Sequence, residues 1–234
     1  MRKVILSVTE DLYTDQRMDK MSLFLHKKGF DVTLVGRRYG DSPVLAARPY
    51  KTHRLRLLFR RGFLFYAEYQ LRLLLYLLFK KCDLLVANDL DTLLPNYLVS
   101  RWRKKPLVYD SHEYFCGELS VVSKPVSYKV WHGIERRIFP KLKTVITVSQ
   151  PIVDQYEKEY GIRPYLVRNI PTADAPPVTA TREELGMPSD KTVLLLQGAG
   201  INEGHGVEDL LQAMRQLPDC KLFIVGTGTI LPQL

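Results

Sequence analysis

The feature that most constrains the fold is the alternation of short apolar runs with helix-like segments. Six runs have the composition of buried strands: RKVILSV (2–8), DVTLVGR (31–37), DLLVAND (83–89), PLVYD (106–110), TVITVS (144–149) and PYLVRN (164–169). Helices are expected between these runs, over 14–28, 63–79, 127–139 and 149–160 and in the segment after Asp91. Strands that alternate with helices predict an α/β fold, a Rossmann-like parallel sheet with helices on both faces.

The composition changes after residue 170. Residues 171–190 are rich in Pro, Thr, Ala and acids, which indicates a linker with one short helical turn near 181–186. A new strand–helix–strand unit then begins with 192–197. We therefore predict a first domain over 1–170, a linker over 171–190, and the start of a second Rossmann-like domain over 191–234.

Cysteine usage and the N-terminus bear on the compartment. The chain has three cysteines, Cys82, Cys116 and Cys220, which lie far apart in the sequence. This pattern fits a reducing compartment and argues against a disulfide scaffold or a zinc site. Residues 2–10 do not have the pattern of a secretory signal peptide. A cytoplasmic location is expected, with peripheral attachment to the inner face of the membrane for the reason given next.

The net charge of +9 is concentrated in one segment. Residues 48–81 hold nine Lys or Arg and a single acid, Glu68. The segment is not a membrane span, because its unbroken apolar run over 73–79 is seven residues long and a span needs about 20. We expect 69–79 to be a buried helix, and 54–66 to dock on anionic lipid. The residues expected at that surface are Arg54, Arg56, Arg60, Arg61 and Phe63. Nucleic acid is the rival partner for a basic patch, but no nucleic-acid motif is present.

A glycine-rich loop follows the strand at 192–197. Gly198, Gly200, Gly204 and Gly206 lie between this strand and a helix-like segment, an arrangement that cradles phosphate groups. Position 203 is Glu, so the pattern is G-x-G-x-x-x-G, and the dinucleotide fingerprint of dehydrogenases is absent. The glycines could instead serve only a tight strand–helix turn.

The order of several motifs resembles a known family. YDSHE, VSQPI, VRNIP and LLLQGAGINEGHGVEDLLQAM appear in the order found in family 4 retaining glycosyltransferases of GT-B fold. The resemblance implies two facing Rossmann-like domains, with the acceptor mainly on the first and a nucleotide-sugar mainly on the second. It implies that His112 is catalytic and reaches the donor sugar, with Glu113 beside it. Arg168 and Asn169 match a turn that faces the cleft.

The resemblance also implies where each substrate binds. The donor would contact Gly198, Gly200, Asn202, Gly204 and His205. The family's two basic residues at the diphosphate look replaced, by Ala199 or a neighbour and by His205. The family's glycine acceptor loop reads TEDLYTDQR here, so acceptor contacts would come from Asp15 and Arg17, and Glu113 is expected as a further acceptor contact. Relatives carry a later acidic motif and need roughly 300–400 residues, so the sequence predicts a truncated chain that is inactive by itself.

The function predicted is transfer of a hexosyl group from a UDP- or GDP-linked sugar to a polysaccharide or lipid-linked acceptor, with retention. No metal and no other cofactor is expected, because helix-start amides and basic side chains can stabilise the leaving diphosphate. Asp89-Leu90-Asp91 resembles the metal motif of the GT-A fold, but Asp91 is better explained as a helix cap. Two alternatives stay open: a non-catalytic sugar- or lipid-binding module, and a nucleotide-sugar epimerase.

Overall fold

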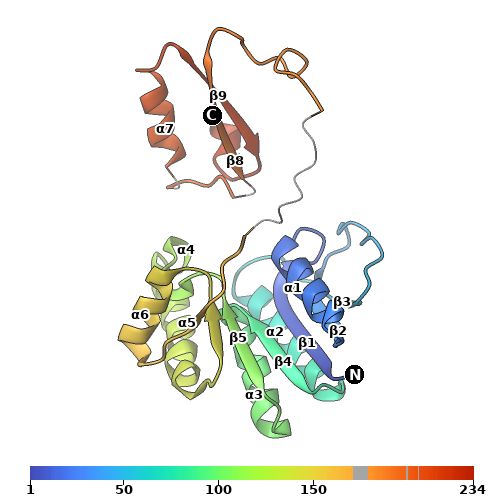
Figure 1. Cartoon of the computed structure of the whole chain (residues 1–234). Helices are drawn as coiled ribbons and strands as arrows, with labels where there is room; N and C mark the ends of the chain where they lie inside the picture. The colour runs from blue at the N-terminus through green and yellow to red at the C-terminus, as the bar shows by residue number, and fades with distance from the viewer. Residues whose placement is uncertain (171–178, 199, 205) are drawn as a thin grey trace. The chain divides into compact units, whose positions relative to one another are not determined.

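A computed structural model describes residues 1–170, 179–198, 200–204 and 206–234. The chain divides into two compact units, Met1–Ile170 and Pro171–Leu234 (Figure 1). Each unit contains its own parallel sheet. No helix among the described residues is both long enough and apolar enough to cross a membrane.

The first unit is built on a seven-stranded sheet in the order β3-β2-β1-β4-β5-β6-β7. The strands are β1 (Lys3–Asp11), β2 (Asp31–Arg38), β3 (Lys51–Arg56), β4 (Leu84–Asn88), β5 (Leu107–Ser111), β6 (Val145–Thr147) and β7 (Tyr165–Leu166). Every neighbouring pair is parallel. The strand order reverses between β1 and β4, and such a switch point opens a crevice at the carboxyl ends of the strands. The Rossmann-like α/β fold predicted from the alternation is confirmed.

Helices cover both faces of this sheet (Figure 1). They are α1 (Gln16–Lys27), α2 (Gly62–Phe79), α3 (Leu90–Arg103), α4 (Leu119–Val122), α5 (Pro125–Ile138) and α6 (Gln150–Tyr160), with short 3-10 turns η1 (Phe115–Gly117) and η2 (Phe139–Lys141). Strand β4 shows how side-chain alternation divides the core. Leu85 and Ala87 belong to clusters formed with α2, α3 and α5, whereas Val86 packs with Met18 of α1.

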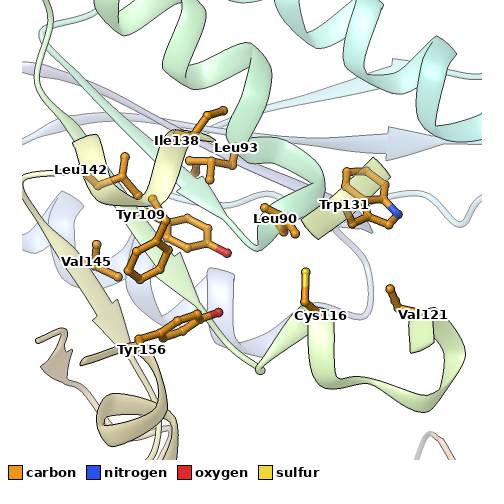
Figure 2. Packing of buried hydrophobic residues seen from close by; sticks show 12 residues of the cluster. Leu90, Leu93, Tyr109, Cys116, Val121, Trp131, Ile138, Leu142, Val145 and Tyr156 are labelled. Atoms are coloured by element: carbon orange, nitrogen blue, oxygen red, sulfur yellow. The ribbon is translucent and has the colours of Figure 1, made fainter. Parts of the chain in front are cut away.

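The core beneath α3, α5 and α6 is aromatic. Figure 2 shows Tyr109 of β5, Trp131 of α5 and Tyr156 of α6 in one cluster. Phe139 stacks on Tyr156 with ring centroids 4.4 Å apart and meets Tyr109 edge-on at 6.0 Å. Aromatic pairs in these geometries add stability beyond the area they bury. The cluster packs against β5 just before the strand reaches its carboxyl end.

The basic segment contains a strand that the sequence analysis did not predict. Lys51–Arg56 forms β3 at the edge of the sheet, paired with β2. Only Leu55 of this strand is buried, and its other side chains are polar or basic. An edge strand with one buried residue carries little apolar alternation, so its sequence resembles a loop.

Helix α2 is only half buried, which corrects the prediction of a buried helix over 69–79. Phe65, Tyr69, Leu73 and Leu77 form its inner face. Its outer face exposes large apolar side chains: Leu64, Leu71, Leu75 and Phe79. Glu68 and Arg72 form the expected i,i+4 ion pair at 2.8 Å. Because both faces are apolar, periodicity alone could not distinguish the inner face from the outer one.

The second unit is small. It pairs β8 (Thr192–Gly198) in parallel with β9 (Cys220–Gly226), joined by α7 (Val207–Met214), and a 3-10 turn η3 (Leu231–Gln233) follows. Its buried cluster among the described residues consists of Ile201, Val207 and Ile230. Near 181–186 the chain forms the single hydrogen-bonded turn that was expected, closed by Leu185 N–H donating to Thr181 O at 3.2 Å.

Candidate active site at the carboxyl ends of the strands

His112 lies between two carboxylates at the carboxyl ends of β4 and β5. Its Nδ1 is 3.2 Å from Asp89 Oδ2, and its Nε2 is 3.2 Å from Asp110 Oδ2. The main-chain N–H of His112 also donates to Asp89 Oδ1 at 2.8 Å. The direction of the Nε2 contact is poor for a hydrogen bond, which leaves Nε2 without a well-formed partner. Asp89 contacts both Nδ1 and the main-chain N–H of His112 and so orients the residue, whereas Nε2 is enclosed and would have to turn away from Asp110 to meet a ligand.

Asp89 has a backbone conformation that residues other than glycine rarely adopt. Its φ is 59° and its ψ is 166°, and it occupies the N-cap position of α3 without making a side-chain cap bond. Its N–H donates to Asp110 O at 2.9 Å, which ties the ends of β4 and β5 together. Strain of this kind costs about 1–3 kcal/mol and concentrates at functional sites. Here it turns the carboxylate toward His112 instead of toward the helix amides.

Arg17 and Asp15 of the α1 start lie at the same site. Arg17 Nη2 donates to both carboxylate oxygens of Asp110 at 2.9 and 3.1 Å, and Asp110 is fully buried. Asp15 accepts a hydrogen bond from Met18 N–H at 2.9 Å and so caps α1. Asp15 and Arg17 were both predicted as acceptor contacts. The structure brings them to His112 and gives each a protein partner as well.

The surroundings of His112 shift the acidities at this site. Burial by itself lowers the pKa of His112, but the carboxylates of Asp110 and Asp89 outweigh burial and raise this pKa above its ordinary value. Burial raises the pKa of Asp89 to about 6, although its contacts with His112 oppose the shift. A histidine whose protonated form is favoured in this way is suited to donate toward a ligand oxygen.

Asp91 is not a helix cap, contrary to the sequence prediction. It lies inside the first turn of α3, fully enclosed, and accepts a hydrogen bond from Thr9 Oγ1 at 2.6 Å. Burial, followed by the nearby charge of Asp89, raises the pKa of Asp91 to about 8. The Asp89 and Asp91 carboxylates thus have different protein partners. Within the described part of the chain, no group of three or more His, Cys, Asp or Glu could hold a metal ion.

The remaining predicted residues of the first unit lie on the same edge but are less enclosed. Glu113 follows His112, its side chain is exposed, and its main-chain O accepts from Ser111 Oγ at 2.7 Å. Arg168 and Asn169 are exposed just after β7. Strand β6 separates β7 from β5.

In the second unit, the glycine loop is closed by its own side chains. Gly204 N–H donates to Glu208 Oε1 at 3.1 Å, so a carboxylate of α7 already binds an amide at the helix start. Asn202 Oδ1 accepts from both the N–H and the hydroxyl of Thr229 at 3.1 Å each. Ala199 and His205 lie outside the described residues. A phosphate bound here would have to compete with Glu208 for the Gly204 amide.

Two further glycines, which the sequence analysis did not single out, bring the next loop against this one. A Cβ on Gly226 would overlap the main-chain O of Gly198, and a Cβ on Gly228 would overlap the main-chain O of Ile201. Thr227 N–H donates to Gly198 O at 3.1 Å. The sequence GTG at 226–228 could have indicated this contact, because glycine permits such a close approach of two backbones.

The basic segment does not present all of its predicted surface residues. Arg54 points inward: its side chain is 11% exposed and pairs with Asp11 at 3.1 Å, so its assignment to a membrane surface is wrong. Arg56, Arg61 and Phe63 are exposed. Arg60 is exposed too, but it forms two hydrogen bonds with Asp41, at 2.9 and 2.7 Å.

Comparison with known proteins identifies the fold family. The model of Glycosyltransferase Family 4 matches residues 16–173, more than half of the chain. The chain belongs to Glycosyltransferase Family 4. The match covers the segments that supply Arg17, Asp89, Asp110 and His112. No curated protein matches the chain in a sequence search.

Solved structures of glycosyltransferases share the GT-B type of fold with this family member. Sucrose-phosphate synthase (tll1590) from Thermosynechococcus elongatus superimposes with a TM-score of 0.72 at 19% identity, covering 100% of this chain and 64% of that protein. WaaG, a glycosyltransferase involved in lipopolysaccharide biosynthesis, gives 0.70 at 18%, covering 98% and 65%. Anabaena Alr3699/HepE in complex with UDP and glucose gives 0.67 at 14%, covering 100% and 63%. The chain thus spans less than two thirds of the length of each of these proteins.

Asp89 and Asp110 are site residues whose role the sequence analysis missed. Asp89 was considered only within a metal motif, and Asp110 only as part of YDSHE. The signal was present, because each acid follows an apolar run that ends at the carboxyl edge of a parallel sheet. No local sequence pattern shows that β4 and β5 are neighbours in the sheet.

Proposed function

We propose that this chain takes part in transfer of a sugar from a nucleotide-sugar to a polysaccharide or lipid-linked acceptor. The observation that carries the proposal is the enclosure of His112 by Asp89 and Asp110 at the carboxyl ends of adjacent strands, in a member of a glycosyltransferase family. The first unit would bind the acceptor, and the second would bind the diphosphate of a UDP- or GDP-linked hexose.

His112 is proposed to act through Nε2. Asp89 fixes Nδ1, and the two carboxylates favour the protonated ring. A protonated Nε2 would donate to a hydroxyl of the donor sugar and stabilise negative charge that develops as the diphosphate leaves. Arg17, held through Asp110, adds a second positive charge beside the ring.

The donor diphosphate is proposed to lie on the loop at 198–206. Gly198, Gly200 and Gly204 allow close backbone approach, and the amides at the start of α7 favour an anion. Metal-free transfer with retention of configuration is part of this proposal. His205, Arg168 and Asn169 are proposed donor contacts, whereas Asn202 acts through its bonds to Thr229.

A direct test measures binding and transfer with a panel of UDP- and GDP-linked hexoses. We expect one donor to bind the wild-type chain, and we expect the Asn202→Ala variant to weaken that binding. Because this chain is expected to be inactive by itself, transfer to glycan or lipid-linked acceptors is assayed with a longer form of the protein, in which His112→Ala should lower the transfer rate by 100-fold or more, the scale of a lost transition-state hydrogen-bond donor. Lys158→Ala, an exposed change remote from the site, is the control.

The outcomes separate the alternatives. A non-catalytic binding module would be favoured if wild type and His112→Ala bind the donor equally well and neither of them transfers the sugar to any acceptor. Conversion of the sugar without an acceptor would favour an epimerase.

Peripheral membrane association is a second part of the proposal. Arg56 is exposed at the end of β3, Arg61 and Phe63 are exposed at the start of α2, and the outer face of α2 is apolar. Each basic residue near an anionic surface contributes about 1 kcal/mol. The Arg56→Ala/Arg61→Ala variant should therefore partition onto anionic vesicles roughly tenfold or more weakly. Lys27→Ala/Lys28→Ala removes the same charge elsewhere and should bind like wild type. The proposal would be contradicted if the wild-type chain does not bind anionic vesicles at low salt but binds DNA.

A further inference from the structure

A cavity lies at the opposite edge of the first unit's sheet, at the amino ends of β5 and β6. Its volume is about 640 Å³, and its walls come from the end of α3, the start of β5 and the segment after η2. Leu107 lines the cavity and begins β5, whereas His112 follows the far end of the same strand. The cavity is therefore separated from the His112 site by the length of the strand.

The lining of this cavity is strongly cationic. It includes five basic side chains and no acidic one. The basic residues are Arg101, Lys104, Lys105, Lys141 and Lys143. Among the described residues, Lys105 alone of these has a carboxylate within 4 Å, Asp83 at 3.7 Å. Holding like charges around one cavity is unfavourable unless an anion occupies it.

Hydrogen bonds fix the main chain at the end of α3, which carries three of these five basic residues. Ser100 Oγ donates to Lys105 O at 2.6 Å, and Lys105 N–H donates to Ser100 O at 2.9 Å. Between them Lys104 has a φ of 51°, in the left-handed region where glycine is usual at a helix end. The dipole of α3 favours cations on its own last turn. It does not account for Lys141 and Lys143, which reach the cavity from another segment.

We propose that this cavity binds a ligand that carries two or more phosphate charges. Its volume is in the range of small-molecule sites, about 300–1,000 Å³. Leu107, Leu142 and Tyr97 also line it and provide apolar surface for an organic part of the ligand. The inference does not rest on sugar transfer, because none of these residues belongs to the His112 site.

Inorganic pyrophosphate is the probe for the first experiment, with isothermal titration calorimetry of the whole chain at low salt. We expect wild type to bind and Lys141→Ala/Lys143→Ala to raise the Kd at least tenfold. Lys129→Ala/Lys158→Ala removes two exposed lysines elsewhere in the first unit and should keep the wild-type Kd. Absence of binding, or equal Kd values for the two double variants, overturns the proposal.

Lys104→Gly separates binding from folding. Glycine accepts the left-handed conformation, so this variant should melt no lower than wild type. It removes one cation, and the pyrophosphate Kd should rise several-fold. An unchanged Kd in a folded Lys104→Gly variant contradicts the site.

The source of the phosphate is decided with vesicles of phosphatidylglycerol. The Arg56→Ala/Arg61→Ala background removes the contribution of the other basic surface. If this variant binds the vesicles, if pyrophosphate reverses that binding, and if adding Lys141→Ala/Lys143→Ala abolishes it, the natural ligand is a lipid headgroup. Pyrophosphate binding without vesicle binding identifies a soluble phosphate compound.

Discussion

At the residue scale, the site consists of buried and partly buried ionisable groups that shift one another's pKa values. One carboxylate oxygen of Asp89 and one of Asp110 each lie 3.2 Å from a ring nitrogen of His112, so the imidazole stands between two carboxylates. Arg17 compensates the second carboxylate. A buried carboxylate is stable only when paired, so each of these residues depends on the others.

Asp89→Asn tests whether the carboxylate sets the protonation of the ring. Loss of the negative charge at Nδ1 should lower the pKa of His112 by roughly one unit or more. Histidine NMR titration measures this directly. Asp83→Asn, at the amino end of the same strand, is the matched control and should leave the His112 pKa unchanged. A His112 pKa that does not move in Asp89→Asn contradicts the orientation described for the ring.

Asp91→Asn tests a pH dependence of stability. Burial raises the native pKa of Asp91 to about 8 from an ordinary value of 3.8, so the native state keeps a proton that the unfolded state releases between these pH values. Protonation thus stabilises the fold at low pH, and this contribution is lost as the pH rises toward 8. Asparagine stays neutral, so urea denaturation at pH 5 and pH 8 should show a smaller loss for Asp91→Asn, by more than about 1 kcal/mol. Equal losses in the two proteins would falsify the assignment.

At the element scale, close approach between strands and loops depends on particular glycines. Gly36 of β2 faces the end of β1, where an added Cβ would overlap the Leu12 side chain and lie 2.7 Å from Glu10 O. The backbone atom cannot move without disturbing the register of β1 and β2. This approach holds the carboxyl end of β1, next to the site, in place.

Gly36→Ala should therefore destabilise the first unit by about 1–3 kcal/mol, the usual cost of overpacking. Thermal denaturation followed by circular dichroism measures the effect. Gly40→Ala is the control, since a Cβ at Gly40 would meet nothing within 4 Å. Similar melting temperatures for both variants would mean that the Gly36 contact relaxes at no cost.

At the scale of the whole molecule, the two units differ greatly in core size. The first unit has three extended clusters of buried apolar residues, whereas the second has Ile201, Val207 and Ile230 among its described residues. Apolar burial supplies most of the stabilisation of a fold. Local opening is therefore expected to be easier in the second unit.

Hydrogen exchange followed by mass spectrometry tests this difference. Amides of β8 and β9 should exchange at least tenfold faster than those of β1, β4 and β5 under native conditions, because fewer apolar contacts oppose their opening. The two sets of strands serve as each other's control within one experiment. Equal protection would show that the second unit is stabilised by more than its buried cluster.

Asp15 and Arg17 were predicted from the resemblance to the family, whereas the sequence by itself determined the α/β fold, most strand and helix positions, and the place of His112 at the carboxyl edge of the sheet. These follow from local periodicity and from the rule that strand ends carry the site. Only the tertiary structure decided that Asp89 and Asp110 enclose His112, that Arg54 is buried on Asp11, and that Lys141 and Lys143 join the end of α3. Apolar spacing records whether a side chain is buried. It does not record which strand lies next to which, and that neighbourhood brings distant charges together.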